Sequence, residues 1–300
     1  MKFLQSRQVL VHYQHGFRAG HSCETQLITT IEELAKSIDD KAQTDVTILD
    51  FAKAFDTVPH RRLLTKLRGY GVDAKLVEWI EEWLTKRTQT VVLDGVQSAP
   101  ARVRSGVPQG TVLGPLLFLI FVNDMGEEID SKMKLVADDC LLYRTIRSEE
   151  DAEQLQSDLD KLHQWSARNY MRFNINKCQQ MTVTLKRSKI CRSYTMDGEE
   201  LQRVKSAKYL GITLTEKLSW REHVREVAKR AMNTPKFARR SLRNCRKTTK
   251  EKTYKALVRP KLEYSASAWT RTGSVMWRLS RPCRDELHGL LPTAMRGMKV

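Results

Sequence analysis

Lys132-Met-Lys-Leu-Val-Ala-Asp138-Asp139-Cys-Leu-Leu-Tyr143 is the stretch of this sequence that says most about the fold. Two short apolar runs flank a pair of adjacent aspartates, as in two β-strands joined by a tight turn. Asp is common in turns, so a plain hairpin would explain the pair taken alone. Two carboxylates in a buried setting are costly, however, because like charges a few ångströms apart resist joint ionisation. A divalent cation relieves that cost, and Mg²⁺ prefers carboxylate oxygens together with substrate phosphates.

A second acidic position lies earlier in the chain. Thr44–Leu49 is a short β-branched run, typical of a buried strand, and it ends at Asp50. If this strand lies beside those around Asp138 in one sheet, we expect Asp50 to face Asp138 at a shared edge. Asp50, Asp138 and Asp139 could then hold two metal ions about 3.5–4 Å apart. One ion would activate a primer hydroxyl, and the other would stabilise a leaving pyrophosphate.

The rest of the chain alternates helices and strands without a regular βαβ rhythm, which predicts the α+β class. Helices are predicted over residues 23–38, 59–68, 73–84, 113–123, 149–168 and 220–258, and short strands over 132–137, 140–143 and 179–214. Thr88–Leu93 and Val96–Val103 are expected to form a hairpin around the turn dipeptide Asp94-Gly95. Asp56 is interpreted as the cap of the helix that Pro59 opens.

Composition favours a folded protein that binds a polyanion. The 300 residues are 41% hydrophobic and 29% charged, with a net charge of +17. Residues 217–261 hold sixteen Lys or Arg against three acidic residues, which suits a phosphate backbone. Taken alone, however, such a block is better explained as a solvated helix face. The six cysteines contain no Cys-x-x-Cys pair, which argues against structural zinc and for an intracellular chain with free thiols. The longest apolar run, 112–122, is too short for a bilayer, so no membrane partner is expected.

The motifs together resemble a known family. Three segments resemble motifs A, B and C of reverse transcriptases. In this order they are Asp50-Phe-Ala-Lys-Ala-Phe-Asp56, Ser105-Gly-Val-Pro-Gln-Gly110 and Ala137-Asp-Asp139. Three further segments also resemble blocks of this family. Gln14-His-Gly-Phe-Arg18 resembles the block that precedes motif A, Asn176-Lys177 resembles motif D, and Tyr209-Leu-Gly211 resembles motif E. The non-LTR (LINE-type) branch is indicated by Thr57-Val-Pro-His60, Leu113-Gly-Pro-Leu-Leu-Phe118, Asn123-Asp124 and Arg259-Pro-Lys-Leu-Glu-Tyr264. Each motif is weak alone, but six in order leave little room for coincidence.

The resemblance implies a right-hand polymerase that adds dNTPs to a DNA primer on an RNA template. It implies two Mg²⁺ ions, with Mn²⁺ as an alternative, held mainly by Asp50 and Asp138 and more weakly by Asp139. Phe55 would be the steric gate, its ring filling the space that a ribose 2′-OH needs, although ordinary core packing explains this residue too. A gate of this kind argues against an RNA-synthesising polymerase.

The resemblance also implies where the nucleic acid lies. Gln109 and Gly110 would lie under the templating base pair, the glycine allowing a close backbone approach. Lys177 would protonate or stabilise the pyrophosphate, although a surface lysine is nearly as good an explanation. Motif E would hold the primer through Tyr209, Leu210 and Gly211. The basic block would be the thumb, whose side chains would contact the phosphates of primer and template. These side chains are Arg225, Lys229, Lys236, Arg239, Arg240, Arg243 and Arg246.

The expected organisation is partial fingers (1–43), a palm (44–215) with an inserted segment at about 57–104, a basic helical thumb (216–270) and a tail (271–300) unlike the family. Only thirteen residues precede Gln14, so incomplete fingers and impaired dNTP capture are expected. A nucleic-acid-binding remnant with little catalysis is therefore the alternative to a working polymerase. A group II intron maturase is disfavoured by the LINE-type segments. Family analogy adds the nucleus as a candidate compartment.

Overall fold

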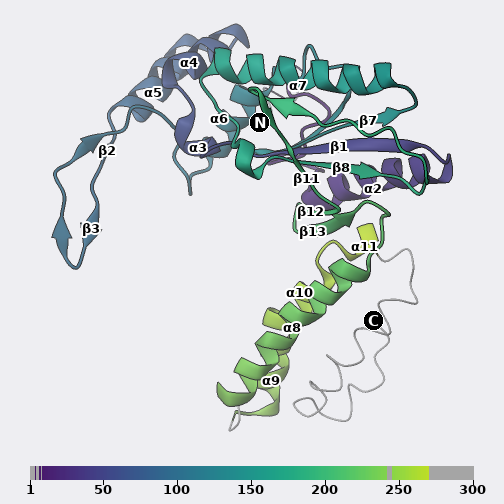
Figure 1. Cartoon of the computed structure of the whole chain (residues 1–300). Coiled ribbons are helices and arrows are strands. Elements are labelled where there is room, and N and C mark those ends of the chain that lie inside the picture. The colour runs from purple at the N-terminus through teal and green to yellow at the C-terminus, as the bar shows by residue number, and fades with distance from the viewer. Residues whose placement is uncertain (1–3, 5–6, 8, 242–244, 270–300) are drawn as a thin grey trace.

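The computed structural model describes residues 4, 7, 9–241 and 245–269. At its centre is a five-stranded sheet in the order β11-β8-β1-β7-β6 (Figure 1). Antiparallel pairing joins β8 (Gln179–Val183), β1 (Gln43–Leu49), β7 (Asp139–Ile146) and β6 (Lys132–Val136). The short β11 (Gln202–Arg203) adds to β8 in parallel. With the helices around it, this sheet confirms the predicted α+β class.

Helices form where the apolar spacing predicts them, with bounds that differ by a few residues at most before the thumb. They are α2 (Cys23–Asp39), α4 (His60–Gly69), α5 (Ala74–Thr85), α6 (Leu113–Val122) and α7 (Glu149–Asn169). Ser22 begins α2 with a capping box shared with Thr25, and Asp73 accepts two backbone N–H groups at the start of α5. The stretch expected as one helix over 220–258 is divided into α8 (Arg221–Ser241), α9 (Lys247–Thr253) and the π-helix η2 (Tyr254–Val258). Within the described part of the chain, no helix has the length and apolar character needed to cross a bilayer.

Both faces of the central sheet are covered, which explains why its strands are apolar on both sides. Leu142 of β7 belongs to the core that packs α6 and α7 on one face. Its neighbours Leu141 and Tyr143 belong to a second core, which includes Leu27 and Leu34 of α2. In Figure 1, α7 lies across one face of the sheet and α2 across the other. The sheet is therefore the rigid centre on which the loops at its edge are mounted.

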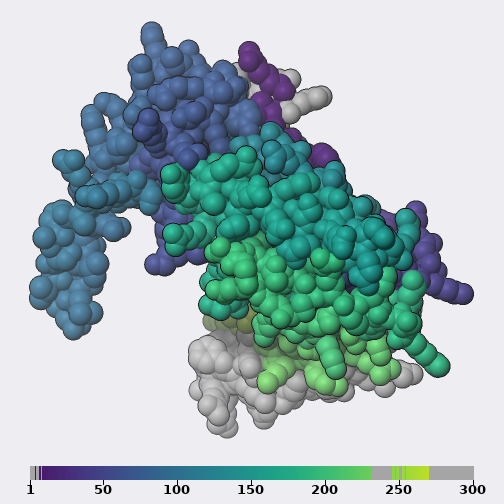
Figure 2. Space-filling view, turned by 45° about the horizontal axis from the view of Figure 1, so that its top comes forward, coloured from purple at the N-terminus to yellow at the C-terminus, as the bar shows by residue number. Residues whose placement is uncertain are grey.

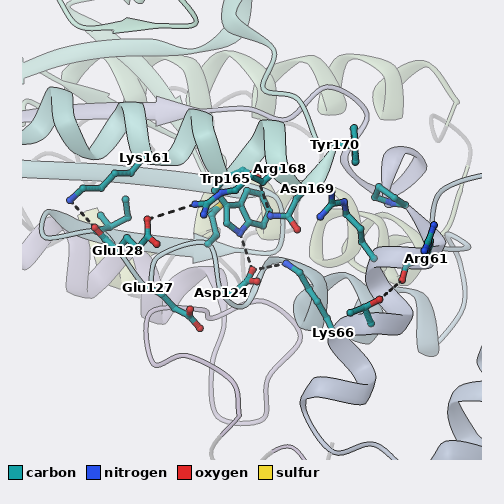
Figure 3. Close-up of a pocket in the computed structure, with 15 residues that line it drawn as sticks. Arg61, Lys66, Asp124, Glu127, Glu128, Lys161, Trp165, Arg168, Asn169 and Tyr170 are labelled. Atoms are coloured by element: carbon teal, nitrogen blue, oxygen red, sulfur yellow. Dashed lines mark hydrogen bonds and ion pairs between the residues drawn. The ribbon is translucent and has the colours of Figure 1, made fainter.

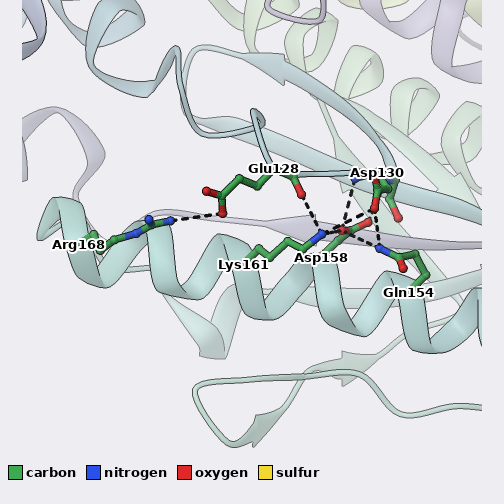
Figure 4. A network of polar contacts seen from close by, with 7 residues as sticks. Glu128, Asp130, Gln154, Asp158, Lys161 and Arg168 are labelled. Carbon is green, nitrogen blue, oxygen red and sulfur yellow. Dashed lines mark hydrogen bonds and ion pairs between the residues drawn. The ribbon is translucent and has the colours of Figure 1, made fainter.

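Buried Asp158 of α7 secures the start of β6. Its carboxylate accepts the backbone N–H groups of Asp130 at 3.4 Å and Ser131 at 2.8 Å. The side chains of Lys161 and Gln154 donate to the same carboxylate at 3.1 and 3.2 Å (Figure 4). A fully buried carboxylate with several donors is well satisfied, so Asp158 ties α7 to the strand that leads into Asp138.

A long hairpin projects from the body of the molecule (Figures 1 and 2). Its paired strands are β2 (Thr88–Gln89) with β5 (Ala101–Arg102), and β3 (Val92–Leu93) with β4 (Val96–Gln97). Asp94 and Gly95 form the turn with φ of 50° and 83°. Positive φ at both central residues is typical of a type I′ turn, so the predicted hairpin is confirmed.

The interpretation of Asp56 as a helix cap is wrong. Helix α4 begins after Pro59, and no side chain caps it. Asp56 lies instead in the short helix α3 (Ala54–Thr57). Its carboxylate accepts Gln109 Nε2 at 3.3 Å, and its backbone carbonyl accepts Ser105 Oγ at 2.9 Å. The carboxylate and the backbone carbonyl of Asp56 both accept hydrogen bonds from the loop at 105–110. This tertiary contact overrides the local preference of Asp for a helix cap.

Candidate active site

Asp50, Asp138 and Asp139 meet at one edge of the central sheet. Strands β1 and β7 are neighbours, as expected, and Leu49 pairs with Cys140. Continuing this register places Asp50 opposite Asp139, while Asp138 lies in the turn that joins β6 to β7. The structure therefore brings the three predicted carboxylates together, with Asp139 rather than Asp138 directly across the ladder from Asp50.

Asp138 and Asp139 resist ionisation, because both are partly buried and lie near other carboxylates. Partial burial, followed by the charges of Asp138 and Asp50, raises the pKa of Asp139 to about 6. Partial burial raises the pKa of Asp138 as well, and the charge of Asp50 adds to the effect. A hard divalent cation would relieve this repulsion, so the donor set fits such an ion. No three His, Cys, Asp or Glu side chains of the described residues converge closely enough to hold a metal, so the carboxylates would have to turn toward it.

Lys177 lies beside the carboxylates. It ends the short 3₁₀ helix η1 (Ile175–Lys177), and its Nζ is 3.5 Å from Asp50 Oδ2. Both side chains are largely exposed, and exposed ion pairs of this kind contribute little to stability. The ammonium group could therefore move from Asp50 to a nearby phosphate at small cost.

The backbone of Asp50 is held by a residue that the sequence-based prediction missed. The thiol Sγ of buried Cys178 lies 3.5 Å from the Asp50 nitrogen and 3.9 Å from its carbonyl oxygen. The Asn174 N–H donates to the same carbonyl oxygen at 2.7 Å. These contacts hold Asp50 just beyond the end of the β1 ladder. The only sequence signal for this contact is that Cys178 directly follows motif D.

The loop carrying Gln109 and Gly110 is fastened to the segment that follows Asp50. The Gly106 N–H donates to the Val58 carbonyl at 2.8 Å. Gly106 has a φ of 90°, and a Cβ there would lie 2.7 Å from the Asp56 carbonyl oxygen. Gln109 and Gly110 are exposed, and a Cβ at Gly110 would meet no atom within 4 Å. The space over Gly110 is thus open to the solvent.

Phe55 packs in the core, as one of its two interpretations predicts. Its half-buried ring stacks on Phe118, with centroids 4.5 Å apart and planes 17° apart, and packs against the core. Core packing is therefore present. The steric gate stays a prediction for this half-buried residue.

Motif E forms a tight hairpin turn between β12 (Ser206–Tyr209) and β13 (Ile212–Thr215). Leu210 and Gly211 occupy the turn with φ of 45° and 81°. The Tyr264 hydroxyl donates to the Leu210 carbonyl at 3.0 Å, and its ring lies against Gly211. The Tyr209 ring is 2% exposed. Tyr209 therefore supports the turn from inside, and of the three residues only Gly211 is exposed to meet a primer.

A cleft of about 490 Å³ extends from the sheet edge to the start of α8. Asp50, Asp139 and Lys177 line one part of it, and Lys208 and Glu226 line another. Helices α8, α9 and α10 (Arg259–Glu263) extend away from the central sheet in Figure 1, and α11 (Ala266–Trp269) follows them.

The predicted phosphate contacts of the thumb are spread along this extension. Arg225 and Lys229 are exposed on α8, and Arg246 is exposed beyond its end. Helix α8 also carries Lys236, Arg239 and Arg240. Arg243 and the tail at 271–300 lie outside the described residues.

A second pocket, of about 660 Å³, lies between α4 and α7 and contains none of the predicted site residues (Figure 3). Lys66 Nζ donates to Asp124 Oδ1 at 2.6 Å and lies over the rings of Phe121 and Trp165. The Trp165 indole N–H donates to the same Asp124 oxygen at 2.9 Å. A largely buried cation with its counterion and two rings is a packing arrangement, so Asp124 has a structural role here.

Comparisons with known proteins agree with the motifs. Residues 1–214 match the family model described as reverse transcriptase (RNA-dependent DNA polymerase). The chain is 32% identical over 243 residues to the probable RNA-directed DNA polymerase from transposon BS of Drosophila melanogaster, a match that covers 76% of this chain and 26% of the relative. It is 31% identical over 224 residues to the RNA-directed DNA polymerase from mobile element jockey of the same fly, covering 72% and 24%. The chain thus spans about a quarter of the length of these relatives.

A solved structure shows the same fold. The apo telomerase from Candida tropicalis superimposes with a TM-score of 0.53 at 11% identity, covering 96% of this chain and 49% of that chain. This likeness confirms the right-hand polymerase fold and says nothing about activity. The predicted resemblance to non-LTR retrotransposon polymerases is also confirmed. Because the family match covers well over half of the sequence and includes motifs A to E, this chain belongs to the reverse transcriptase family.

Proposed function

We propose that this chain is the catalytic core of a retrotransposon RNA-directed DNA polymerase, which transfers nucleotides to a primer 3′-hydroxyl. The observation that carries the proposal is the proximity of Asp50, Asp138 and Asp139 at one sheet edge. Asp50 and Asp139 line an open cleft there together with Lys177. Reverse transcriptases in general use divalent metal ions. The carboxylate donors suit two Mg²⁺ ions, with Mn²⁺ as a substitute.

Each group at the edge has a part in this chemistry. Asp50 and Asp138 would be the principal ligands of the ions, with Asp139 as a weaker third. The bound ions supply activation of the primer hydroxyl and neutralisation of the leaving pyrophosphate. Lys177, now paired with Asp50, would place its positive charge on the pyrophosphate. Gly110, with open space around it, would let the templating base pair approach the backbone.

The partners we propose are an RNA template, a DNA primer and dNTPs. The exposed Gly211 of the motif E turn would lie against the primer. Arg225, Lys229 and Arg246, also exposed, would contact phosphates by charge and without reading base sequence. We keep the proposed division into fingers (1–43), palm (44–215) and thumb (216–270).

Primer extension on an RNA template, with Mg²⁺ and dNTPs, tests the proposed function. The purified chain is expected to extend the primer, and an Asp138→Ala, Asp139→Ala double variant is expected not to. A chain that binds template–primer but never extends it would be the alternative, a nucleic-acid-binding remnant. The intact carboxylate edge favours the enzyme.

Phe55→Val is expected to raise the use of rNTPs relative to dNTPs by roughly tenfold, because a smaller side chain leaves room for the 2′-OH. The measurement is the ratio of kcat/KM for matched rNTP and dNTP. Phe173→Val is the control, since Phe173 is also a stacked phenylalanine, with its centroid 4.4 Å from that of Phe51. An unchanged ratio in Phe55→Val would return Phe55 to a purely packing role.

A further inference from the structure

We infer that Gln14 is a positioning residue for the catalytic pair, because its buried side-chain amide holds the turn that presents Asp138 and Asp139. The inference rests on the proposed function, since it gives the block before motif A a task in building that site. Gln14 does not touch a reacting atom. It acts through the backbone of Ala137, the residue directly before Asp138.

The side chain of Gln14 contacts both the backbone N–H and the backbone carbonyl of Ala137. Its Oε1 accepts the Ala137 N–H at 3.0 Å, and its Nε2 lies 3.5 Å from the Ala137 carbonyl oxygen. The same Oε1 accepts the Gly16 N–H at 2.7 Å. Gln14 is 1% exposed, so water cannot replace these bonds. Deleting the amide would leave buried backbone groups unpaired, which is destabilising.

Ala137 needs such support because its backbone is strained. Its φ is 55°, in the left-handed region that is unfavourable for an L-residue. The turn must also keep Asp138 and Asp139 near Asp50, although three carboxylates repel one another. A relaxed turn would let the pair move apart. The amide of Gln14 opposes this movement by binding the turn from the core side.

The chain around Gln14 is itself anchored to the sheet. The Leu135 N–H donates to the Tyr13 carbonyl at 2.9 Å, and the His15 N–H donates to the Leu135 carbonyl at 2.8 Å. This pairing adds a short parallel segment next to β6. The Arg18 guanidinium donates to the Gln14 carbonyl at 3.0 Å. The backbone of Gln14 is therefore fixed next to β6, which allows its side chain to hold the turn at Ala137.

Gly16 completes the arrangement by allowing the two backbones to touch. A Cβ at Gly16 would collide with the backbone nitrogen of Ala137. Gln14, Gly16 and Arg18 of Gln14-His-Gly-Phe-Arg18 thus serve one contact: Gln14 binds the turn, Gly16 makes room for it, and Arg18 supports Gln14. Gln14 and Gly16 are the buried residues of this block.

Gln180→Met is a matched control for Gln14→Met. Gln180 is a buried glutamine whose Oε1 accepts the Tyr194 N–H and whose Nε2 donates to the Leu201 carbonyl, both at 3.1 Å. It lies in β8 and holds a different segment. Both variants lose a buried amide of the same shape, so both should lose stability. Only Gln14→Met should change the catalytic turn.

Two measurements separate the variants. Hydrogen–deuterium exchange at the Ala137 amide is expected to be at least roughly tenfold faster in Gln14→Met and unchanged in Gln180→Met. Mn²⁺ affinity, followed by the EPR signal of free Mn²⁺ with template–primer present, is expected to fall by roughly tenfold in Gln14→Met alone, as for lost outer-shell contacts in other metal sites.

Each outcome decides a different point. Unchanged exchange at Ala137, or equal Mn²⁺ affinity in Gln14→Met and the unaltered chain, would overturn the positioning role and leave the proposed function standing. An Asp138→Asn variant is measured alongside. If Mn²⁺ binding does not respond to Asp138→Asn, the metal site of the proposed function fails, and the role of Gln14 fails with it.

Discussion

Asp138→Asn is expected to lower the rate of primer extension by at least roughly 10³-fold, because an amide cannot supply the charge of a carboxylate metal ligand. Asn has the same shape as Asp, so the turn and the sheet should remain intact. The measurement is kcat for a single nucleotide addition in Mg²⁺. Asp160→Asn is the matched control, since Asp160 is an exposed carboxylate on α7. Retention of a tenth or more of the activity in Asp138→Asn would refute the assignment.

The same variant should be more stable than the unaltered chain when no metal is present. Removing one of three repelling charges is worth less than about 1 kcal/mol here, because the carboxylates are partly open to water. The pKa of Asp139 is raised to about 6 in the folded chain, above that of an unfolded Asp. Its folded form therefore loses stability as the pH rises through about 6.

Thermal unfolding in EDTA at several pH values tests this effect. The advantage of Asp138→Asn in Tm should be absent near pH ~4 and grow as the pH approaches 7, as ionisation of Asp139 sets in. A variant that is less stable at neutral pH would mean that Asp138 supports the fold. Loss of activity with a gain in stability separates a functional residue from a structural one.

Gly106→Ala is expected to destabilise the protein by about 3 kcal/mol or more and to remove its activity. The φ of 90° is unfavourable for alanine, and the new Cβ would lie within 2.9 Å of three backbone atoms of Asp56. Backbone atoms cannot rotate away as a side chain can. The loop with Gln109 and Gly110 would have to move away from Asp56, in the segment that follows Asp50.

Gly20→Ala provides the comparison for this variant. Gly20 has a similar positive φ of 75°, but a Cβ there would meet no atom within 4 Å. It should cost only about 1 kcal/mol, the penalty of the left-handed backbone alone. Urea unfolding of both variants measures the difference. Equal costs would mean that the contact between Gly106 and Asp56 is not tight.

Local residue patterns were enough to predict most of the secondary structure. The apolar spacing after Ser22, the cap at Asp73 and the turn at Asp94-Gly95 each depend on neighbours within a few residues. The proposed use of the three carboxylates was also predicted from the sequence, mainly through the resemblance of the motifs in order. Such signals are local in the chain, and local propensities operate there.

Contacts between segments that are distant in the sequence could not be predicted from local patterns, because they depend on tertiary packing. Gln14 and Ala137 are 123 residues apart, and their bond depends on how the sheet and its N-terminal extension assemble. The position of Asp139 opposite Asp50, the burial of Tyr209 and the use of Asp56 by the 105–110 loop have the same origin. The carboxylates themselves can be read from the sequence. Their orientation comes from packing and hydrogen bonds summed over the whole chain, which outweigh any single residue's local preference.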